Sequence, residues 1–396
     1  MLVIAAPGQG AQTPGFLSPW LELPGFADRL AAWSDLAGVD LIRCGTTADA
    51  DEIRDTAVAQ PLLVAAAIAT AEALTGDQVP LKGLTAVVAG HSVGELAAGA
   101  IAGTISPENA MRLVRVRAQG MAAAAAAVPT GMTAVLGGDQ AEVLAAIEAH
   151  GLTPANINGS GQIVAAGTLT ALAAFAADPP PKARLRPLSV AGAFHTSFMS
   201  PAVEALAQAA AAVPASDPVL PLLSNLDGAQ VKTGADWLQR IIAQVSAPVR
   251  WDSCTATMAR LGASALIELP PAGTLTGLVR RALSGLEILA LKTPDDLDAA
   301  RQMLAEHANA PDGSHAPEWR LLVAPAAGTF RAPADGARAA GAAVPAGAAI
   351  GQVEVRGGGH EVAPTFAGTI IEWLVEDGDP VGAGQPLLRL LPDGRE

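Results

Sequence analysis

From Met1 to about His307, short apolar runs alternate with longer stretches of helical periodicity, and this alternation constrains the fold more than any other feature. Short apolar runs predict buried strands and the longer stretches predict helices. The expected strands are Leu2–Ala6, Ala86–Ala89, Thr133–Leu136, Ile163–Ala166, Leu185–Val190, Leu220–Leu223, Ala265–Leu269 and Ile288–Leu291. The expected helices are Gln60–Leu74, Glu95–Ala102, Pro107–Val128, Gln140–His150, Pro201–Val213 and Trp237–Ser246. Such alternation is typical of an α/β domain with a mainly parallel sheet.

Residues 129–190 depart slightly from this pattern. They predict strand, helix, strand, helix, strand, with turn residues at Gly137-Gly138-Asp139 and Asp178–Pro181. We therefore expect a small α+β subdomain inserted in the larger domain 1–307.

A second, different domain is expected after His307. Residues 308–319 have the polar, turn-rich composition of a linker. Beyond them the helical period disappears, and the segments 324–330 and 341–347 are echoed by 363–370 and 378–384. Two similar halves of short strands predict a small β domain at 320–396 with internal two-fold symmetry.

Composition excludes several classes of function. Aromatic residues make up 3% of the chain, with no Tyr, and the net charge is −14, so nucleic-acid binding is not expected. The N-terminus has no basic segment and no uninterrupted apolar run reaches about 20 residues, so we expect neither secretion nor a membrane span. The two cysteines match no zinc spacing. A cytoplasmic protein without metal or cofactor is expected.

The motif Gly90-His91-Ser92-Val93-Gly94 lies between an expected strand and an expected helix. In a G-x-S-x-G turn of this kind the serine is exposed at a helix N-terminus, where backbone N–H groups stabilise an oxyanion. Ser92 is therefore a candidate nucleophile. An ordinary Gly-rich turn is the competing interpretation.

A serine nucleophile needs a base, and His195 is the best placed of six histidines. It follows an expected strand and precedes the helix that begins near Pro201, so capping that helix is its alternative role. No Asp or Glu between Ser92 and His195 stands out as a third member. We expect a Ser-His dyad.

Arg117 lies in the apolar stripe of its helix. An unpaired buried guanidinium costs several kcal/mol. Either an internal carboxylate pairs with Arg117, or the side chain awaits an anionic ligand.

Taken together and in order, these motifs resemble the malonyl-CoA:acyl carrier protein transacylases over Met1 to about Glu306. The resemblance also rests on the loop Pro7–Gln12, the segment Asn156–Asn158 with Gln162–Gly167, the pair Ser224-Asn225, and Gln244–Trp251. Glu268–Gly273 departs from the family, which more often has Gly-Pro-Gly there.

The resemblance implies a hydrolase-like large subdomain with an inserted ferredoxin-like subdomain. It implies ping-pong transfer of malonyl from malonyl-CoA to acyl carrier protein through Ser92, with His195 as base, for fatty acid or polyketide synthesis. Backbone N–H groups of Gln9 and Val93 would form the oxyanion hole, and a carbonyl near Gln244 would orient His195.

In the same comparison Arg117 would bind the malonyl carboxylate. The other substrate-binding residues that the resemblance assigns are Gln244, Phe194 and Asn156. Phe194 and Val93 resemble malonyl-selective members, since methylmalonyl-selective relatives tend to have Ser and Gln there.

The tail resembles a biotinyl/lipoyl carrier module of the barrel-sandwich type. Such a module carries its cofactor on a lysine at a hairpin tip, here expected at Arg356–His360. All lysines precede the linker (Lys82, Lys182, Lys232 and Lys292). Biotinylation and lipoylation are therefore excluded, which leaves a docking or oligomerisation role, or an inert relic.

Two other functions stay open at this point. A thioester or ester hydrolase would use the same Ser92 and His195 without a use for Arg117. A non-catalytic scaffold would dock through its β tail.

Overall fold

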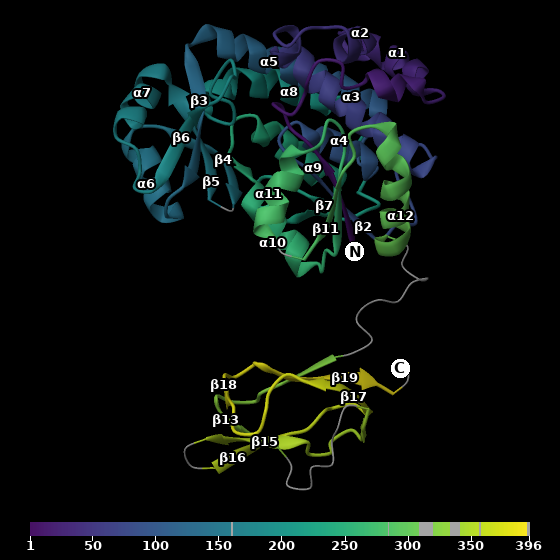
Figure 1. Ribbon diagram of the computed structural model, residues 1–396, viewed down its shortest axis with the longest axis vertical. Helices are drawn as coiled ribbons and strands as arrows, with labels where there is room; N and C mark the ends of the chain where they lie inside the picture. Colours follow the sequence, from purple (N-terminus) through teal and green to yellow (C-terminus); the bar gives the residue numbers. More distant parts are fainter. Residues whose placement is uncertain (160, 284, 309–319, 333–340, 356–357, 394–396) are drawn as a thin grey trace. The chain divides into compact units, whose positions relative to one another are not determined.

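The structure is a computed structural model that describes residues 1–393 apart from 160, 284, 309–319, 333–340 and 356–357 (Figure 1). The chain divides into two compact units, Met1–Asn309 and Ala310–Glu396. The expected linker at 308–319 lies outside the described residues, except for Ala308.

A six-stranded sheet forms the centre of the first unit, in the order β11-β10-β1-β2-β7-β8. All neighbours are parallel except β7 and β8. The strands are β1 (Leu2–Ala6), β2 (Ala86–Gly90), β7 (Leu222–Leu223), β8 (Gln230–Val231), β10 (Ala265–Glu268) and β11 (Glu287–Ala290). The mainly parallel sheet expected from the sequence is confirmed, and the comparisons below agree with it.

Helices cover both faces of this sheet. On β1, Leu2 and Ile4 face one core, which is shared with α3, α4, α5, α9 and α12. Val3 and Ala5 face a second core, shared with α10 and α11. Because both faces are buried, the strands are continuously apolar rather than alternating. The helices are α1 (Phe26–Ala37), α2 (Leu41–Thr46), α3 (Thr56–Thr75), α4 (Gly94–Ile101), α5 (Pro107–Ala127), α8 (Ser200–Ala211), α9 (Gly234–Gln244), α10 (Trp251–Arg260), α11 (Thr274–Ala282) and α12 (Leu297–His307). Short 3-10 turns lie at η1 (Ser18–Glu22), η2 (Glu52–Arg54), η3 (Ser197–Met199) and η4 (Pro294–Asp296).

Five of these helices, α1, α2, α10, α11 and α12, are missing from the expectation. Four of the five begin without a side-chain N-cap: α1 and α11 start after Gly25 and Gly273, and α10 and α12 after Arg250 and Asp296. The usual start signal of a helix, a capping Ser, Thr, Asp or Asn side chain, is therefore not used there.

Helix α3 is long and apolar enough to cross a membrane by length and composition, with a mean hydropathy of 1.6. Its apolar run is interrupted by Gln60 and Glu72, and 78% of its most apolar window is buried inside the protein. These features are those of a core helix, and α3 packs against α4 and α5.

A second sheet forms at residues 130–187, in the order β6-β3-β5-β4-β9. Its elements are β3 (Thr130–Gly137), α6 (Gln140–Ala149), β4 (Thr153–Gly159), β5 (Gln162–Thr168), α7 (Leu169–Ala177) and β6 (Ala183–Pro187). The expectation of three strands here is wrong, because β4 was missed. Its sequence contains Pro154, Asn156 and Asn158 and is irregularly paired, so it carries no apolar alternation. The sheet also gains β9 (Val249–Arg250), which pairs in parallel with β4 from outside this segment.

The C-terminal unit is built from two four-stranded antiparallel sheets, ordered β12-β19-β17-β14 and β16-β15-β13-β18. The two orders are related by an exchange of the unit's halves. When β12, β13, β14 and β15 are exchanged with β16, β17, β18 and β19, in that order, the strand order of one sheet becomes that of the other. Each sheet thus takes two strands from each half, which is the two-fold pattern expected from the sequence echoes. The strands are β12 (Arg320–Val323), β13 (Gly328–Arg331), β14 (Ala343–Val344), β15 (Gly351–Val355), β16 (Gly358–Val362), β17 (Gly368–Trp373), β18 (Pro380–Val381) and β19 (Pro386–Pro392). The first two residues of the expected tip, Arg356 and Gly357, lie outside the described residues.

Phe330 anchors the core of this unit. Its side chain is 1% exposed and contacts the Trp373 ring, with ring centroids 5.6 Å apart. Phe330→Ala should lower the free energy of unfolding of this unit by about 3–5 kcal/mol, because a cavity replaces the ring. Calorimetry should show one transition moving while that of the first unit stays. Leu321→Ala, at a position 44% exposed, is the control and should change stability by less than about 0.5 kcal/mol. Equal effects of the two variants would contradict this placement of the core.

Candidate active site

Ser92 lies on a sharp turn between β2 and α4, in the backbone conformation that strains any residue but glycine (φ +53°). The turn leaves no room on either side. A Cβ on Gly90 would lie 2.0 Å from the Gly94 carbonyl carbon, and a Cβ on Gly94 would lie 2.3 Å from the Ala6 carbonyl oxygen. The two glycines are therefore required by close approach, which excludes an ordinary Gly-rich turn here.

The Ser92 hydroxyl oxygen lies 2.6 Å from Nε2 of His195. His195 is 3% exposed and also has a positive φ, +61°. Its Nδ1 lies 2.8 Å from the backbone carbonyl oxygen of Gln244, so Nδ1 donates and Nε2 is free to accept the serine proton. A carbonyl thus takes the place of the missing acid. The alternative role, a cap of the helix that begins near Pro201, is wrong, because that helix (α8) starts after Met199 with no side-chain cap. Thr196 rather than His195 caps the η3 turn before it.

The imidazole of His195 is neutral over a wide range of pH. Burial, together with the positive charge of Arg117, lowers its pKa to about 3. A neutral imidazole is the form that acts as a general base.

Arg117 is 1% exposed on α5 and reaches the nucleophile. Its two terminal nitrogens donate to amide oxygens, Nη1 to Gln60 Oε1 at 2.6 Å and Nη2 to Gln244 Oε1 at 2.8 Å. Nη2 also lies 3.4 Å from the Ser92 hydroxyl oxygen, while Nε has no hydrogen-bond partner among the residues that the structure describes. Burial lowers the pKa of Arg117 to about 10, so the group stays charged at neutral pH.

Within the described part of the chain, no carboxylate contacts this guanidinium. Glu95 is the anion that offsets its charge, and it does so from behind Gln244. The geometry therefore favours the second sequence alternative, an anionic ligand that completes the coordination of Arg117.

The remaining predicted residues are Gln9, Val93, Phe194 and Asn156. The Gln9 side chain donates to the Arg54 carbonyl and to the Thr56 hydroxyl oxygen, and Val93 is the N-cap residue of α4. Phe194 is 6% exposed beside His195. Asn156 lies on β4 and makes no hydrogen bond to Ser92, His195 or Arg117 among the described residues; its Oδ1 is buried without a partner. The structure thus brings together Ser92, His195, Arg117 and Gln244, but not Asn156.

Three polar residues of the site escaped sequence reasoning: Gln60, Glu95 and Asn225. Gln60 interrupts the apolar run of α3, and Glu95 immediately follows the nucleophile motif on a helix that is otherwise apolar. All three are nearly fully buried. A lone polar residue in an apolar run was the available signal. His91 is also explained, because its Nε2 lies 2.9 Å from Asn158 Oδ1, away from Ser92.

Comparison with known proteins places this site in a family. A family model described as "Acyl transferase domain" matches residues 5–309. The malonyl CoA-acyl carrier protein transacylase of Mycobacterium tuberculosis is 54% identical over 298 residues, which cover 75% of this chain and 98% of that protein. The crystal structure of MCAT from M. tuberculosis superposes with a TM-score of 0.72 at 52% identity, covering 76% of this chain and 99% of that one. A complex titled as a type II PKS acyl-carrier protein with its malonyl-transacylase gives 0.69 at 28% identity, covering 76% and 99%.

The first unit is therefore an acyltransferase of the acyl transferase domain family. Within that family, the chain belongs to the malonyl CoA-acyl carrier protein transacylases.

The low pKa of His195 makes the stability of the first unit depend on pH. In the unfolded chain a histidine takes up a proton near pH 6.5, whereas the buried His195 does so near pH 3. Between these values the unfolded state binds more protons, so stability falls as the pH falls, by about 3 kcal/mol from pH 6.5 to pH 4 for this group. His195→Gln should flatten the pH dependence of the free energy of unfolding in denaturant titrations.

Ser92→Ala is the matched control, because it alters the same dyad but keeps the imidazole. It should retain the wild-type pH dependence. An unchanged dependence in His195→Gln would contradict the burial of a neutral histidine.

Proposed function

We propose that the chain transfers a malonyl group from malonyl-CoA to the phosphopantetheine thiol of acyl carrier protein, through a malonyl ester on Ser92. The observation that carries this proposal is the buried charge of Arg117, 3.4 Å from the Ser92 hydroxyl oxygen and bound only by neutral groups. An acyl group that ends in a carboxylate supplies the missing anion. A charge-assisted hydrogen bond of this kind contributes about 1.5–3 kcal/mol.

In the first half-reaction Ser92 attacks the thioester carbonyl while His195 Nε2 takes the hydroxyl proton. Backbone N–H groups of Gln9 and Val93 stabilise the oxyanion. The tetrahedral intermediate collapses, the C–S bond breaks, and the CoA thiolate leaves with the proton from His195. The malonyl ester of Ser92 remains.

The second half-reaction reverses these steps with a different thiol. His195 takes the proton of the carrier-protein thiol, and the sulfur attacks the ester carbonyl. The C–O bond to Ser92 breaks, and the serine oxygen recovers its proton from His195. The product is malonyl-acyl carrier protein, an extender unit for fatty acid or polyketide synthesis.

The malonyl carboxylate also changes the pKa of the general base, His195. Arg117 is one cause of the low pKa of His195. A carboxylate bound to Arg117 offsets that positive charge, so the pKa of His195 rises when malonyl-CoA binds. Phe194 and Val93 support selection of malonyl over methylmalonyl, and one methyl group is worth about 1–3 kcal/mol in such a pocket. We keep Gln244 and Asn156 as substrate-binding residues, Gln244 through its contact with Arg117 and Asn156 through its unpartnered Oδ1.

We assign residues 1–307 to the acyltransferase domain, with the inserted subdomain at about 129–190, and 320–396 to the β domain. The antiparallel order β6-β3-β5-β4 with two connecting helices supports a ferredoxin-like subdomain. The exchange of strands between its halves supports a biotinyl/lipoyl-like barrel sandwich for the tail. Without a lysine, the tail serves docking or oligomerisation in this proposal. Two free, buried cysteines support a reducing cytoplasm.

Intact-mass analysis tests the covalent intermediate directly. Purified protein mixed with malonyl-CoA should gain one malonyl group, and holo-acyl carrier protein added afterwards should remove it and gain the same mass. Ser92→Ala should form no adduct, because it removes the hydroxyl that lies 2.6 Å from Nε2 of His195. Ser197→Ala, two residues beyond His195, is the control and should acylate normally.

The other outcomes name other functions. An adduct that drains only to free malonate would make the protein a thioester hydrolase. No adduct with any acyl-CoA would leave the scaffold interpretation.

A further inference from the structure

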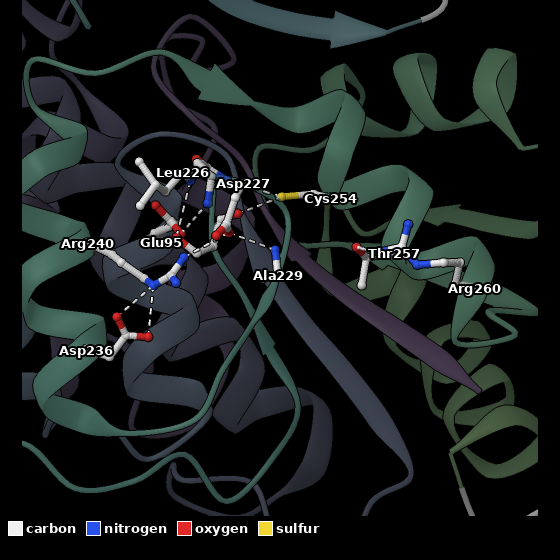
Figure 2. A network of polar contacts seen from close by, with 11 residues as sticks. Glu95, Leu226, Asp227, Ala229, Asp236, Arg240, Cys254, Thr257 and Arg260 are labelled. Atoms are coloured by element: carbon white, nitrogen blue, oxygen red, sulfur yellow. Dashed lines mark hydrogen bonds and ion pairs between the residues drawn. The ribbon is translucent and has the colours of Figure 1, made fainter.

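Glu95 lies one helical turn after Ser92 on α4, and its carboxylate is 1% exposed. One oxygen, Oε1, accepts a hydrogen bond from the backbone N–H of Asn225 at 2.8 Å. The other, Oε2, accepts one from the side-chain amide of Gln244. Figure 2 shows Glu95 within a network of polar contacts, beside Leu226 and Asp227. The reaction steps above do not use this buried carboxylate.

The hydrogen bonds that Glu95 accepts favour an ionised carboxylate over a protonated one. The N–H groups of Asn225 and Gln244 only donate, so both carboxylate oxygens must accept. A protonated carboxyl would place an O–H group against one of these donors. Burial nevertheless raises the pKa of Glu95 to about 8, although its hydrogen bonds and Arg117 act in the opposite direction.

Gln244 is the link between Glu95 and Arg117. Its amide has a donor end and an acceptor end, and the two can exchange places by rotation. The Nε2 end faces Glu95, and therefore the Oε1 end faces Arg117 Nη2 at 2.8 Å. The opposite orientation would set an N–H group against the guanidinium. Nε2 also donates to the Ser92 backbone carbonyl oxygen at 3.0 Å and to Asn225 Oδ1 at 3.3 Å. Three acceptors therefore fix the productive orientation together, and Glu95 is the charged one among them.

A second arm of the same carboxylate reaches the nucleophile turn. Asn225, held by Glu95, accepts the Ser92 backbone N–H on Oδ1 at 2.7 Å and donates Nδ2 to the Gly90 carbonyl at 2.8 Å. In Glu95→Gln, the remaining carbonyl oxygen can still accept a hydrogen bond from the Asn225 backbone N–H, so the contacts of Asn225 with the nucleophile turn are kept. The new amide nitrogen then faces Gln244 Nε2, and the hydrogen bond between residue 95 and Gln244 is lost.

We propose that Glu95 is a positioning residue for substrate selection: its carboxylate orients the Gln244 amide so that Arg117 is held to receive the carboxylate of the acyl group. This inference rests on the proposed function, because it assumes that Arg117 binds the malonyl carboxylate. Glu95 itself touches neither the substrate nor the reacting atoms.

The test compares the rates at which malonyl-CoA and acetyl-CoA acylate Ser92, measured by intact mass in single-turnover reactions. Acetyl has no carboxylate, so only the malonyl rate depends on the position of Arg117. Glu95→Gln should lower the malonyl-to-acetyl ratio by ~10- to 100-fold, the loss of a hydrogen bond to a charged group, and should leave the acetyl rate within about threefold.

Glu268→Gln is the matched control. Glu268 is also a fully buried carboxylate, and it accepts three backbone N–H groups at the start of α11 (Gly273, Leu275 and Thr276). The Glu268→Gln variant should have lower thermal stability than the wild type but the same malonyl-to-acetyl ratio. In an Arg117→Ala background, Glu95→Gln should have no further effect on the ratio, because its effect passes through Arg117.

The pH dependence gives a readout that also works if Glu95→Gln fails to fold. Arg117 from α5 and Cys254 from α10 face Glu95; the pKa of Arg117 is about 10, and burial raises that of the Cys254 thiol, so neither changes charge between pH 7 and pH 9. His195 stays neutral there, and so does His91, whose pKa burial lowers. The wild-type ratio should therefore rise with pH through about 8 as Glu95 ionises, and Glu95→Gln should remove this rise.

Three results would overturn the inference: equal loss of both rates in Glu95→Gln, the same loss of ratio in the Arg117→Ala background, or a wild-type ratio that is flat in pH. A wild-type enzyme that shows no preference for malonyl would instead overturn the proposed function.

Discussion

The buried guanidinium of Arg117 is the charge around which the rest of this candidate active site is arranged. It lies on an apolar helix face, in contact with two neutral amide oxygens and the nucleophile. Burying such a charge without a paired anion costs free energy. Glu95 offsets this charge only partly, because Gln244 separates its carboxylate from the guanidinium. In the proposed function the carboxylate of the malonyl group completes this charge balance, so the buried guanidinium selects an acyl group that ends in a carboxylate.

The same region shows how a serine and a histidine are held together without an acidic third residue. Gln244 serves twice, because its backbone carbonyl orients His195 and its side chain contacts Arg117. Two residues with positive φ, Ser92 and His195, face each other across a 2.6 Å contact. Backbone strain of this kind persists only where packing enforces it, and here the close approach of Gly90 and Gly94 provides that packing.

Much of this could be anticipated from the sequence, and most of the misses have an identifiable physical cause. Ser92 was predicted from the G-x-S-x-G motif, and His195 because the chain has only six histidines. Arg117 was predicted because it places a charge in an apolar stripe of its helix. β4 was missed because its residues are polar and bulged, and α1, α10, α11 and α12 because no side chain caps their starts. The role of Glu95 depends on hydrogen-bond partners 130 and 149 residues away, a relationship that periodicity does not record.

The most direct test of the account is the ratio of Ser92 acylation rates with malonyl-CoA and acetyl-CoA in wild type and in Arg117→Ala. Loss of the guanidinium should lower the malonyl-to-acetyl ratio by about 100-fold. The acetyl rate should stay the same or rise, because the pKa of His195 rises when the positive charge of Arg117 is removed. A ratio that survives the removal of Arg117 would show that the buried charge does not select the substrate, and the central claim would fail.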